Sequence, residues 1–402
     1  MSQARAGQLL AWLEETEPEF VRLVERLACA ESPTRDAGAQ AAAFAILAGE
    51  LEDAGYRARR VGRPDGGTHL YARPHGRRRH GPFQLVVGHM DTVWPVGTLR
   101  RMPVYRDGDL LFGPGTYDMK AGLAQFVFAV KALAACGFPP TVTPVVLINA
   151  DEEIGSPTSR RTIERLARHA DRAFVLEAGD GPDGRLKIAR KGVGLYRLTI
   201  HGRASHAGTS FDEGVSAVLE LSHQVQRLFA LNDPRRGVTV NVGTVDGGMR
   251  PNVVAPEATA EIGVRVPTAR AARELDRSLR SLRPVLRGST LELSGGIGRP
   301  PMEATPRNRA LFATAQRLGR DVGLALAVAG VVGGGSDANT TSRYTATLDG
   351  LGPIGGGDHA AHEHICIDAT TQRTALLALL LLEPASRPRR QTPPRTASAT
   401  SS

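Results

Sequence analysis

Acidic and imidazole side chains stand just beyond three apolar runs of this sequence. His89, Glu153 and Glu177 each follow such a run within a few residues, and each run has the length and composition of a buried strand. In open α/β sheets, ligands bind at the edge where the strands have their carboxyl ends. Groups of this kind gathered on one edge would repel one another or lack partners without a cation. The pattern therefore indicates a metal site at that edge.

Two motifs have both a chemical and a purely structural interpretation. His89 stands two residues before Asp91, a spacing that suits a metal ligand and the acid that orients it, or an incidental histidine in a surface turn. Asp118 lies in the Gly/Pro-rich segment 113–120, before a predicted helix. It is either the N-cap of that helix or a bridge between two metals, since a carboxylate has two oxygens.

The acidic run at residues 151–153 offers two different functions at one strand end. Neighbouring side chains diverge there, so Glu153 can bind a metal while Glu152 acts as a general base toward water. An acidic patch on a solvated loop is the alternative for this run, and a solvated loop acid is the alternative for Glu177.

A histidine-rich segment completes the set. His359, His362 and His364 are three of only 11 histidines in the chain; the alternative is a plain polar loop. Together with the acids they form a nitrogen and oxygen donor set that suits zinc or its first-row neighbours. The three cysteines form no CxxC pair, so a thiolate zinc site is not expected.

Composition argues against nucleic-acid and membrane partners. The chain has 402 residues and a formal charge of +9, of which four charges are arginines after Ala385. Aromatic residues make up 5%, too few for base-stacking platforms. The longest aliphatic run, 375–382, is far shorter than the roughly 20 residues that span a bilayer. No signal peptide is evident, and we expect a cytoplasmic protein.

Alternation of apolar strands and helices predicts an α/β fold with a mostly parallel, helix-covered sheet. The order β-α-β-β-α-β after Gly192 predicts a ferredoxin-like unit inserted in it. We expect a catalytic domain at 1–191 and 306–385, an inserted lid domain at 192–305 and a disordered tail at 386–402. Predicted helices are 3–27, 37–54, 118–136, 158–169, 215–231, 269–286, 308–322 and 370–382. Predicted strands are 56–61, 69–73, 83–87, 145–149, 173–176, 195–200, 238–243, 259–266, 290–293 and 346–348.

The five motifs, in this order, resemble those of the co-catalytic di-zinc aminoacylase, carboxypeptidase and dipeptidase family. The resemblance covers about residues 27–383 and is closest in look to the bacterial glutamate carboxypeptidase branch. Three further stretches carry that likeness: Ser-His-Ala-Gly at 205–208, Gly-Arg-Pro at 298–300 and Gly-Gly-Gly-Ser-Asp-Ala at 333–338. It implies a zinc-peptidase-type sheet with helices on both faces and a lid that also forms the dimer contact.

The resemblance implies two Zn²⁺ per subunit, with Co²⁺ or Mn²⁺ as alternatives. One metal would be held by His89 and Glu177, the other by Glu153 and His359, and Asp118 would bridge them. Glu363, four residues after the ligand histidine, favours His359 over its neighbours. The family pattern further implies that Asp91 orients His89, that Glu152 is the general base and that the Asp118–Met119 peptide is cis.

Substrate-binding groups are implied in the same way. His206 would reach the neighbouring subunit's active site and stabilise the oxyanion, unless it is a lid-surface histidine. Asn252 would contact the substrate carbonyl or carboxylate. Arg299 would pair with a substrate carboxylate, a task that suits its guanidinium fork, unless it is a solvated loop residue. Gly334 and Gly335 would let backbone N–H groups approach the same carboxylate.

The implied activity is metal-dependent hydrolysis of an amide bond beside a free carboxylate, in a small peptide or N-acyl amino acid. Residues 184–187 depart from the glutamate-specific pattern, Phe211 replaces a common proline, and Arg190 and Lys191 are additional basic candidates. Specificity for glutamate is therefore open. The alternatives are an N-acyl amino acid deacylase with the same site and, more remotely, a non-catalytic binding protein.

Overall fold

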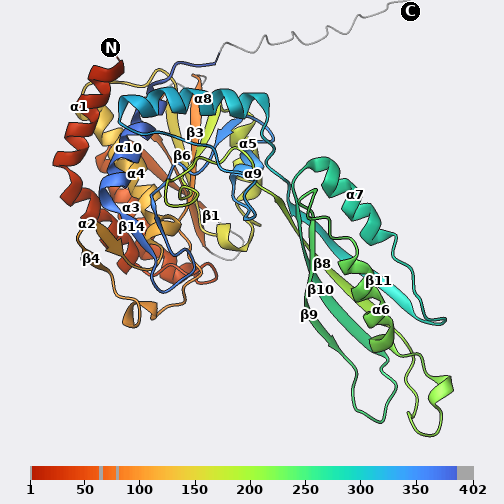
Figure 1. The fold of residues 1–402 in the computed structure, drawn as a ribbon. Helices are drawn as coiled ribbons and strands as arrows, with labels where there is room; N and C mark the ends of the chain where they lie inside the picture. Colours follow the sequence, from red (N-terminus) through yellow and green to blue (C-terminus); the bar gives the residue numbers. More distant parts are fainter. Residues whose placement is uncertain (1, 63–66, 78–80, 387–402) are drawn as a thin grey trace, which may run out of the picture.

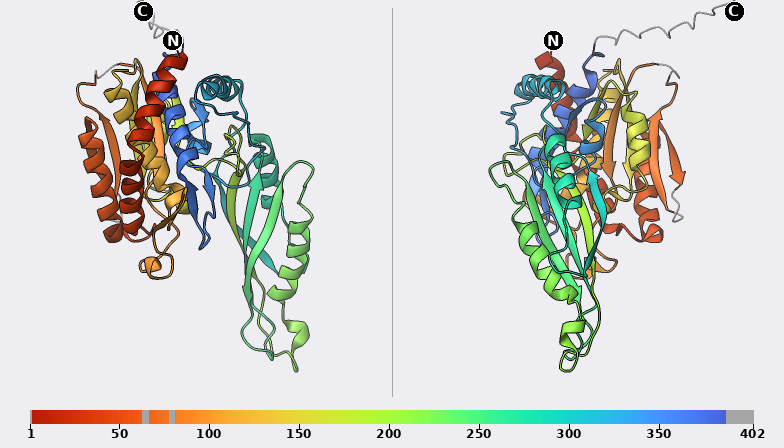
Figure 2. Two further views of the ribbon diagram at one scale, coloured as in Figure 1. Left: turned by 60° about the vertical axis from the view of Figure 1, so that its left-hand side comes forward. Right: turned by 90° about the vertical axis from the view of Figure 1, so that its right-hand side faces the viewer.

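The computed structural model describes residues 2–62, 67–77 and 81–386. Figure 1 shows a helix-covered sheet, from which a second, elongated sheet with two helices projects to one side. The left view of Figure 2 shows the same separation into two bodies, whereas in its right view the second body overlaps the first. The predicted tail, apart from Ser386, lies outside the described residues.

The central sheet has six strands in the order β1-β2-β6-β3-β7-β12. Neighbours in the run β6-β3-β7-β12 are parallel, whereas β1 and β2 are antiparallel at one edge. The strands are β1 (Tyr56–Gly62), β2 (Thr68–Pro74), β3 (Phe83–His89), β6 (Thr143–Asn149), β7 (Arg172–Val175) and β12 (Ala346–Leu348). A mostly parallel sheet is therefore present, as the sequence predicts.

Helices cover both faces of this sheet. Every residue of β3 is buried, because successive side chains of a strand point to opposite faces and both faces are packed. Val86 belongs to the core under one group of helices, while Leu85 and Val87 belong to the core on the other face. The first group is α1 (Ser2–Glu15), α2 (Glu17–Cys29), α3 (Ala37–Asp53), α4 (Ala121–Ala135), α8 (Pro306–Asp321) and α10 (Ile367–Leu382); the second is α5 (Arg160–Ala167) and α9 (Ala338–Thr341).

Two predicted helices differ clearly from the real ones. The single helix at 3–27 is wrong, because α1 and α2 are separated at Thr16, whose hydroxyl donates to the carbonyl of Trp12 at 2.9 Å. Pro18 lacks an N–H and fits only the first turn of a new helix. The helix predicted at 269–286 ends at Arg280, since Pro284 disfavours helical backbone just before it.

The projecting body is the predicted ferredoxin-like unit. Its antiparallel sheet has the order β11-β8-β10-β9, and its two helices pack on one face of that sheet. Its elements are β8 (Gly192–His201), α6 (Ala217–Phe229), β9 (Thr239–Gly247), β10 (Glu257–Val266), α7 (Ala269–Arg280) and β11 (Thr290–Arg299). We call this body the lid; the domain boundaries at 191/192 and 305/306 stay predictions.

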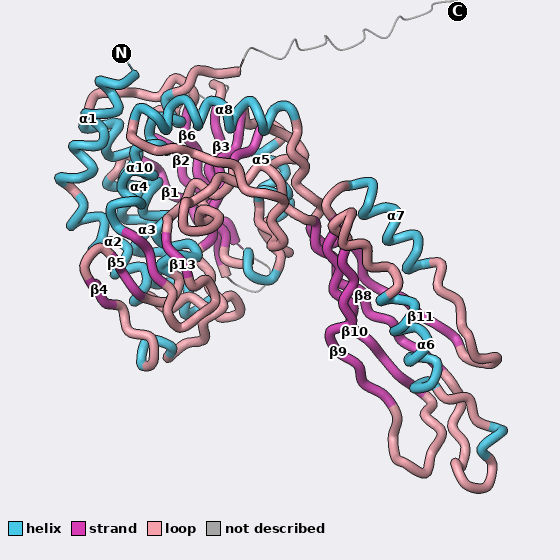
Figure 3. The backbone as a smooth tube through the Cα atoms, viewed as in Figure 1, coloured by secondary structure: helices cyan, strands magenta, loops and turns pink. Residues whose placement is uncertain are grey.

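A third, small sheet was not predicted. It has the order β13-β14-β5-β4 and joins the histidine-rich segment to the loop before Asp118 (Figure 3). The strands are β4 (Tyr105–Asp107), β5 (Leu110–Phe112), β13 (Gly355–Gly356) and β14 (His364–Cys366). Strands of two or three residues are too short to show a period in the sequence. Single helical turns lie at Thr98–Arg100, Glu152–Ile154 and Phe211–Glu213, and Thr116–Lys120 is an irregular turn with non-helical backbone at Asp118 and Met119.

Candidate active site

The carboxyl ends of three adjacent parallel strands bring the first predicted residues together. β3 ends at His89, and Glu177 lies two residues beyond the end of β7. The His89 Nε2 atom is 3.9 Å from Glu177 Oε1 and 3.0 Å from Asp118 Oδ1. His89 is fully enclosed, with 1% of its surface exposed. Asp118 reaches this point from the turn before α4.

A second imidazole faces the other oxygen of the same aspartate. His359 Nε2 lies 3.4 Å from Asp118 Oδ2 and 3.4 Å from Glu153 Oε2. The two oxygens of Asp118 are thus turned toward two different histidines, the arrangement that a bridging carboxylate requires. His364 instead packs its ring 5.1 Å from that of Phe112.

The charges of this group fit a pair of divalent cations. Burial and the neighbouring Asp118 and Glu152 raise the pKa of Glu177 well above its usual value, and burial likewise raises the pKa of Glu153. Hydrogen bonds to Asp118 and Glu153 raise the pKa of His359 to about 10. Three carboxylates crowd two imidazoles, of which His89 is buried and His359 is exposed, and cations of the zinc type would neutralise this excess negative charge. The donor set therefore fits the implied metals.

Asp91 contacts His89, but with a different atom from the one expected. The Nδ1 atom of His89 bonds to the main-chain oxygen of Asp91 at 2.8 Å, whereas the nearest carboxylate oxygen is 3.6 Å away. The carboxylate accepts instead from the Thr34 hydroxyl and from the backbone N–H groups of Glu152 and Glu153. Asp91 therefore fixes both the imidazole and the turn that carries the two glutamates.

Glu363 organises the loop around Asp118. Its carboxylate accepts hydrogen bonds from the backbone N–H groups of Gly115, Tyr117 and Asp118 at 2.9–3.0 Å, and from Trp94 Nε1 at 2.9 Å. From the sequence alone, the position of Glu363 serves only to favour His359 as the expected ligand. The Asp118–Met119 peptide that follows this loop is cis, as the resemblance implies.

Arg299 is already engaged with Glu152. Its Nη1 atom lies 2.5 Å from Glu152 Oε1 and its Nη2 atom 2.5 Å from the Glu152 carbonyl oxygen. A further bond reaches the hydroxyl of Ser156 at 3.2 Å. The residue expected to bind a substrate carboxylate thus pairs with the expected general base, and it does so from the last residue of the lid strand β11.

His206 and Asn252 are not brought to the metal cluster within this chain. β8 begins at Gly192, which lies against the backbone of Arg299, and its ten residues end at His201. At about 3.3 Å per residue the strand leads about 30 Å away. The loop beyond it, light green in Figure 1, forms the tip of the lid. There the Ala207 N–H donates to the carbonyl of Asn252 at 3.0 Å.

Two hollows meet at the cluster. One, of about 320 Å³, is lined by all the proposed ligands except His89 and by Lys187 and Arg190. The other, of about 540 Å³, is lined by Arg160, Arg265 and Arg299. Gly334 and Gly335 line both hollows, between the two groups of cations. Arg265 could not be found from the sequence, because it is one polar residue among the alternating residues of a regular strand.

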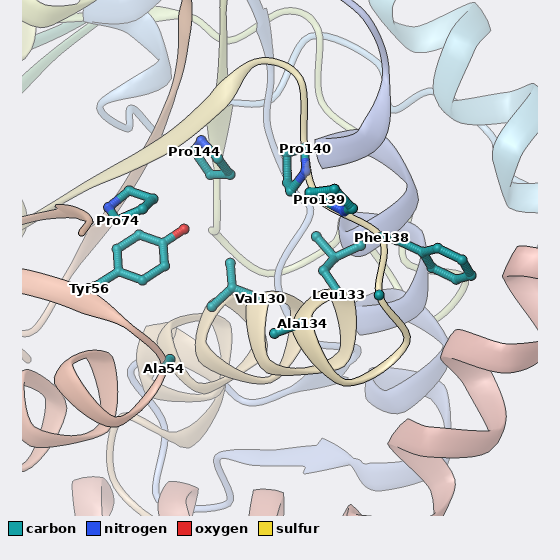
Figure 4. A pocket seen from close by; sticks show the side chains of 11 residues that line it. Ala54, Tyr56, Pro74, Val130, Leu133, Ala134, Phe138, Pro139, Pro140 and Pro144 are labelled. Carbon is teal, nitrogen blue, oxygen red and sulfur yellow. The ribbon is translucent and has the colours of Figure 1, made fainter. Parts of the chain in front are cut away.

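A separate hollow of about 310 Å³ has an apolar lining that includes Tyr56, Leu133 and Pro139 (Figure 4). It also touches Pro144, near the start of β6, whereas the metal cluster lies beyond the end of β6. This hollow is therefore not part of the candidate active site. In the part of the chain that the structure describes, no helix combines the length and apolar character needed to cross a membrane.

A helix-covered parallel sheet that gathers imidazoles and carboxylates around one bridging aspartate, together with an antiparallel lid, is typical of a metal-dependent hydrolase. The model of the Peptidase family M20/M25/M40 matches residues 85–383. The chain belongs to this family, which confirms the predicted resemblance and an enzyme that hydrolyses peptide or amide bonds with the help of metal ions. The alternative of a non-catalytic binding protein is not supported.

Relatives agree with this assignment. Carboxypeptidase G2 of Pseudomonas sp. (strain RS-16) is 30% identical over 397 residues, which cover 95% of this chain and 93% of the relative. Succinyl-diaminopimelate desuccinylase of Delftia acidovorans is 26% identical over 86% of this chain and 93% of its own.

Solved structures share the fold. Aminopeptidase PepT of Bacillus cereus ATCC 10987 superposes with a TM-score of 0.73 at 19% identity, over 92% of this chain and 98% of that one. The Bacillus subtilis YXEP protein, a dinuclear metal binding peptidase from the M20 family, has a TM-score of 0.67 at 14% identity over 92% and 98%.

Proposed function

We propose that this protein hydrolyses an amide bond next to a free carboxylate, in a small peptide or an N-acyl amino acid. The observation that carries the proposal is the placement of Asp118, whose two oxygens face His89 and His359 separately. This placement supports two metal positions on either side of one carboxylate rather than a single ion.

The metals would be two Zn²⁺, with Co²⁺ or Mn²⁺ as alternatives. His89 and Glu177 would hold one, Glu153 and His359 the other, and Asp118 both. When bound, such ions supply Lewis-acid activation of water and of the scissile carbonyl. Donor chemistry supports zinc but does not by itself choose among these metals.

Glu152 is the proposed general base. It follows β6 on the same turn as the proposed ligand Glu153 and lines both hollows. Its carboxylate would take a proton from the attacking water and deliver it to the leaving amine nitrogen. Arg299 would bind the free carboxylate of the substrate, and that carboxylate would compete with Glu152 for the guanidinium.

The lid is proposed to join two copies of the chain. β9 is an edge strand of the lid sheet, and large apolar side chains are exposed near it, including Phe211 at 64% and Met249 at 71%. Patches of this kind mark protein contacts. Pairing through the lid would carry the partner subunit's His206 and Asn252 to the substrate, which a single chain does not do.

A deacylase of N-acyl amino acids is the second candidate, and the likeness to a desuccinylase favours it. A zinc-loaded hydrolysis screen decides between the two. Peptides and conjugates that end in glutamate are compared with simple N-acyl amino acids of the same chain length. Faster turnover of the glutamate conjugates supports the carboxypeptidase, and faster turnover of the acyl series supports the deacylase. No turnover of either series would reject the proposed function.

A further inference from the structure

A buried aspartate that no step of the proposed function uses lies close to Arg299. Asp337 occupies the N-cap position of α9, yet its side chain makes no capping hydrogen bond there. The Ser336 hydroxyl accepts from the Ala338 N–H instead. An aspartate at an N-cap usually accepts from the first N–H groups of its helix. Since only 2% of Asp337 is exposed, its carboxylate is committed to other groups inside the protein.

The carboxylate of Asp337 holds both ends of the turn that carries Glu152. One oxygen accepts from Asn149 Nδ2, at the end of β6, and the other accepts from the Ser156 hydroxyl, each at 2.5 Å. The proposed base and the proposed ligand Glu153 lie between these two contacts. Because the serine hydroxyl donates its only proton to Asp337, it can act toward other groups only as an acceptor.

The group that the Ser156 hydroxyl accepts from is Arg299. Its Nη2 atom donates to this hydroxyl at 3.2 Å and to the Glu152 carbonyl oxygen at 2.5 Å, while its Nη1 atom contacts the Glu152 carboxylate. Burial lowers the pKa of Arg299, but the charges of Glu152 and Asp337 outweigh burial and raise it above its usual value. A chain of contacts therefore runs from Asp337 through Ser156 to the guanidinium.

The backbone of Ser156 indicates that its hydroxyl has a function. Ser156 is buried and has a φ of 57°, and Gly155 before it has a φ of 94°. Glycine adopts this left-handed region readily, whereas a residue with a Cβ does so at a cost in stability. Strained residues of this kind gather at functional sites. The two hydrogen bonds of the serine hydroxyl are what a glycine at this position could not supply.

The segment before α9 supports Arg299 at a second point. A Cβ atom on Gly335 would lie 3.1 Å from Arg299 Cδ, so the absence of a side chain lets the stem of the arginine pass close to the backbone. One short segment, with Gly335 and Asp337 two residues apart, therefore fixes both the stem and the head of this arginine.

We propose that Asp337 and Ser156 are positioning residues that keep the Arg299 guanidinium in place when a substrate carboxylate displaces Glu152 from it. The inference rests on the proposed function, which places that carboxylate at Arg299. During the exchange Nη1 changes its partner, while Nη2 keeps its bond to the Ser156 hydroxyl. A guanidinium that is already fixed loses less conformational freedom when the substrate binds. Neither Asp337 nor Ser156 lines the two hollows, so each acts through Arg299.

The test measures how well the zinc-loaded enzyme distinguishes an acid from its carboxamide. Ser156→Gly removes the hydroxyl and relieves the left-handed backbone, so the fold should be retained. We expect kcat/KM for a substrate with a free terminal carboxylate to fall by about 5- to 30-fold, mainly through KM, and that for its C-terminal amide to fall by about twofold at most. The matched control Ser289→Gly removes another hydroxyl that donates to a buried carboxylate, that of Glu220 in the lid, and should keep both values. Equal losses for acid and amide in Ser156→Gly would overturn the positioning role.

A second variant shows whether the two residues act as one unit. Asp337→Asn offers one acceptor oxygen to two donors, Asn149 and Ser156, so it should weaken the preference for the acid to a similar extent. In the double variant the loss should match that of one single variant, because both changes break the same chain of contacts. A loss equal to the product of the two single losses would contradict the proposed chain.

Calorimetry on the zinc-loaded enzyme separates failure of this inference from failure of the proposed function. Free glutamate and its α-amide, isoglutamine, probe Arg299 without any hydrolysis. The wild type should bind glutamate about tenfold more tightly than isoglutamine, and Ser156→Gly should lose most of this difference while Ser289→Gly keeps it. A full difference in Ser156→Gly would overturn the positioning role alone. Equal affinities in the wild type would reject the carboxylate clamp of the proposed function, and this inference with it.

Discussion

The guanidinium of Arg299 and the carboxylate of Glu152 are joined at 2.5 Å, which links the last strand of the lid to the turn that carries the proposed base. The two residues are separated by 147 positions in the chain. Because a substrate carboxylate would compete for the same guanidinium, binding of substrate and the freedom of Glu152 to act are coupled at this one contact.

Replacing the proposed base tests its role apart from metal binding. Glu152→Gln keeps the size of the side chain but cannot accept the proton of water, so kcat should fall by about 10²- to 10⁴-fold. Zinc content, measured by elemental analysis, should stay at two per chain. The control Glu164→Gln on α5 alters a half-buried acid that pairs with Arg168 and Arg343, and it should keep both values. A Glu152→Gln enzyme with near wild-type turnover would exclude this base.

Arg299→Met tests the carboxylate clamp. We expect kcat/KM to fall at least tenfold for a substrate with a free terminal carboxylate and much less for its C-terminal amide, because only the acid pairs with the guanidinium. Arg197→Met, on the same lid and paired with Glu261, is the control. If Arg299→Met impairs acid and amide equally, the residue acts through Glu152 alone and the clamp is rejected.

Glu363 should act as a positioning residue for Asp118. In Glu363→Gln one acceptor oxygen becomes an N–H donor that faces backbone N–H groups, so the loop should shift and zinc affinity should fall by about 10- to 100-fold. Competition with a chromogenic chelator measures this change. The control Glu383→Gln removes only a pair with Arg317 at the end of α10. Unchanged zinc affinity in Glu363→Gln would show that the loop holds its shape without this carboxylate.

Complementation tests the shared active site. His206→Ala and Glu152→Gln chains should each be nearly inactive, because each copy would lack one essential group. If the partner subunit's His206 serves each site, a mixed dimer contains one site with both groups intact, so mixing and re-pairing the chains should restore up to about a quarter of wild-type activity, a statistical limit set by random pairing. Light scattering should give the mass of a dimer. A monomeric, fully active protein would contradict the proposal.

Much of the architecture follows from local pattern. The buried strands β3, β6 and β7 are continuous apolar runs, and the polar residues after them predict which sheet edge carries the cluster. The predicted helix boundaries were wrong where a single proline interrupts a helix that the periodic pattern would continue, as at Pro18 and Pro284. The sheet of β4, β5, β13 and β14 was not predicted, because strands of two or three residues are too short to show an alternation of apolar and polar residues.

Contacts between distant residues are the part that the sequence does not contain. The pairing of Arg299 with Glu152 depends on how the lid strand meets the catalytic sheet, and no spacing encodes it. The use of the Asp91 main-chain oxygen, rather than its carboxylate, depends on the local path of the backbone. The guanidinium of Arg190 likewise shows which of its donors are satisfied only when Asp349 and Gly334 are placed around it. Its Nη2 atom then has no hydrogen-bond acceptor among the described residues.

The proposed mechanism requires a pair of metals on either side of Asp118, and anomalous diffraction from zinc-loaded crystals would locate both. We expect two peaks, one among His89, Asp118 and Glu177 and the other among Asp118, Glu153 and His359. A single peak, or peaks that lie away from these side chains, would contradict it.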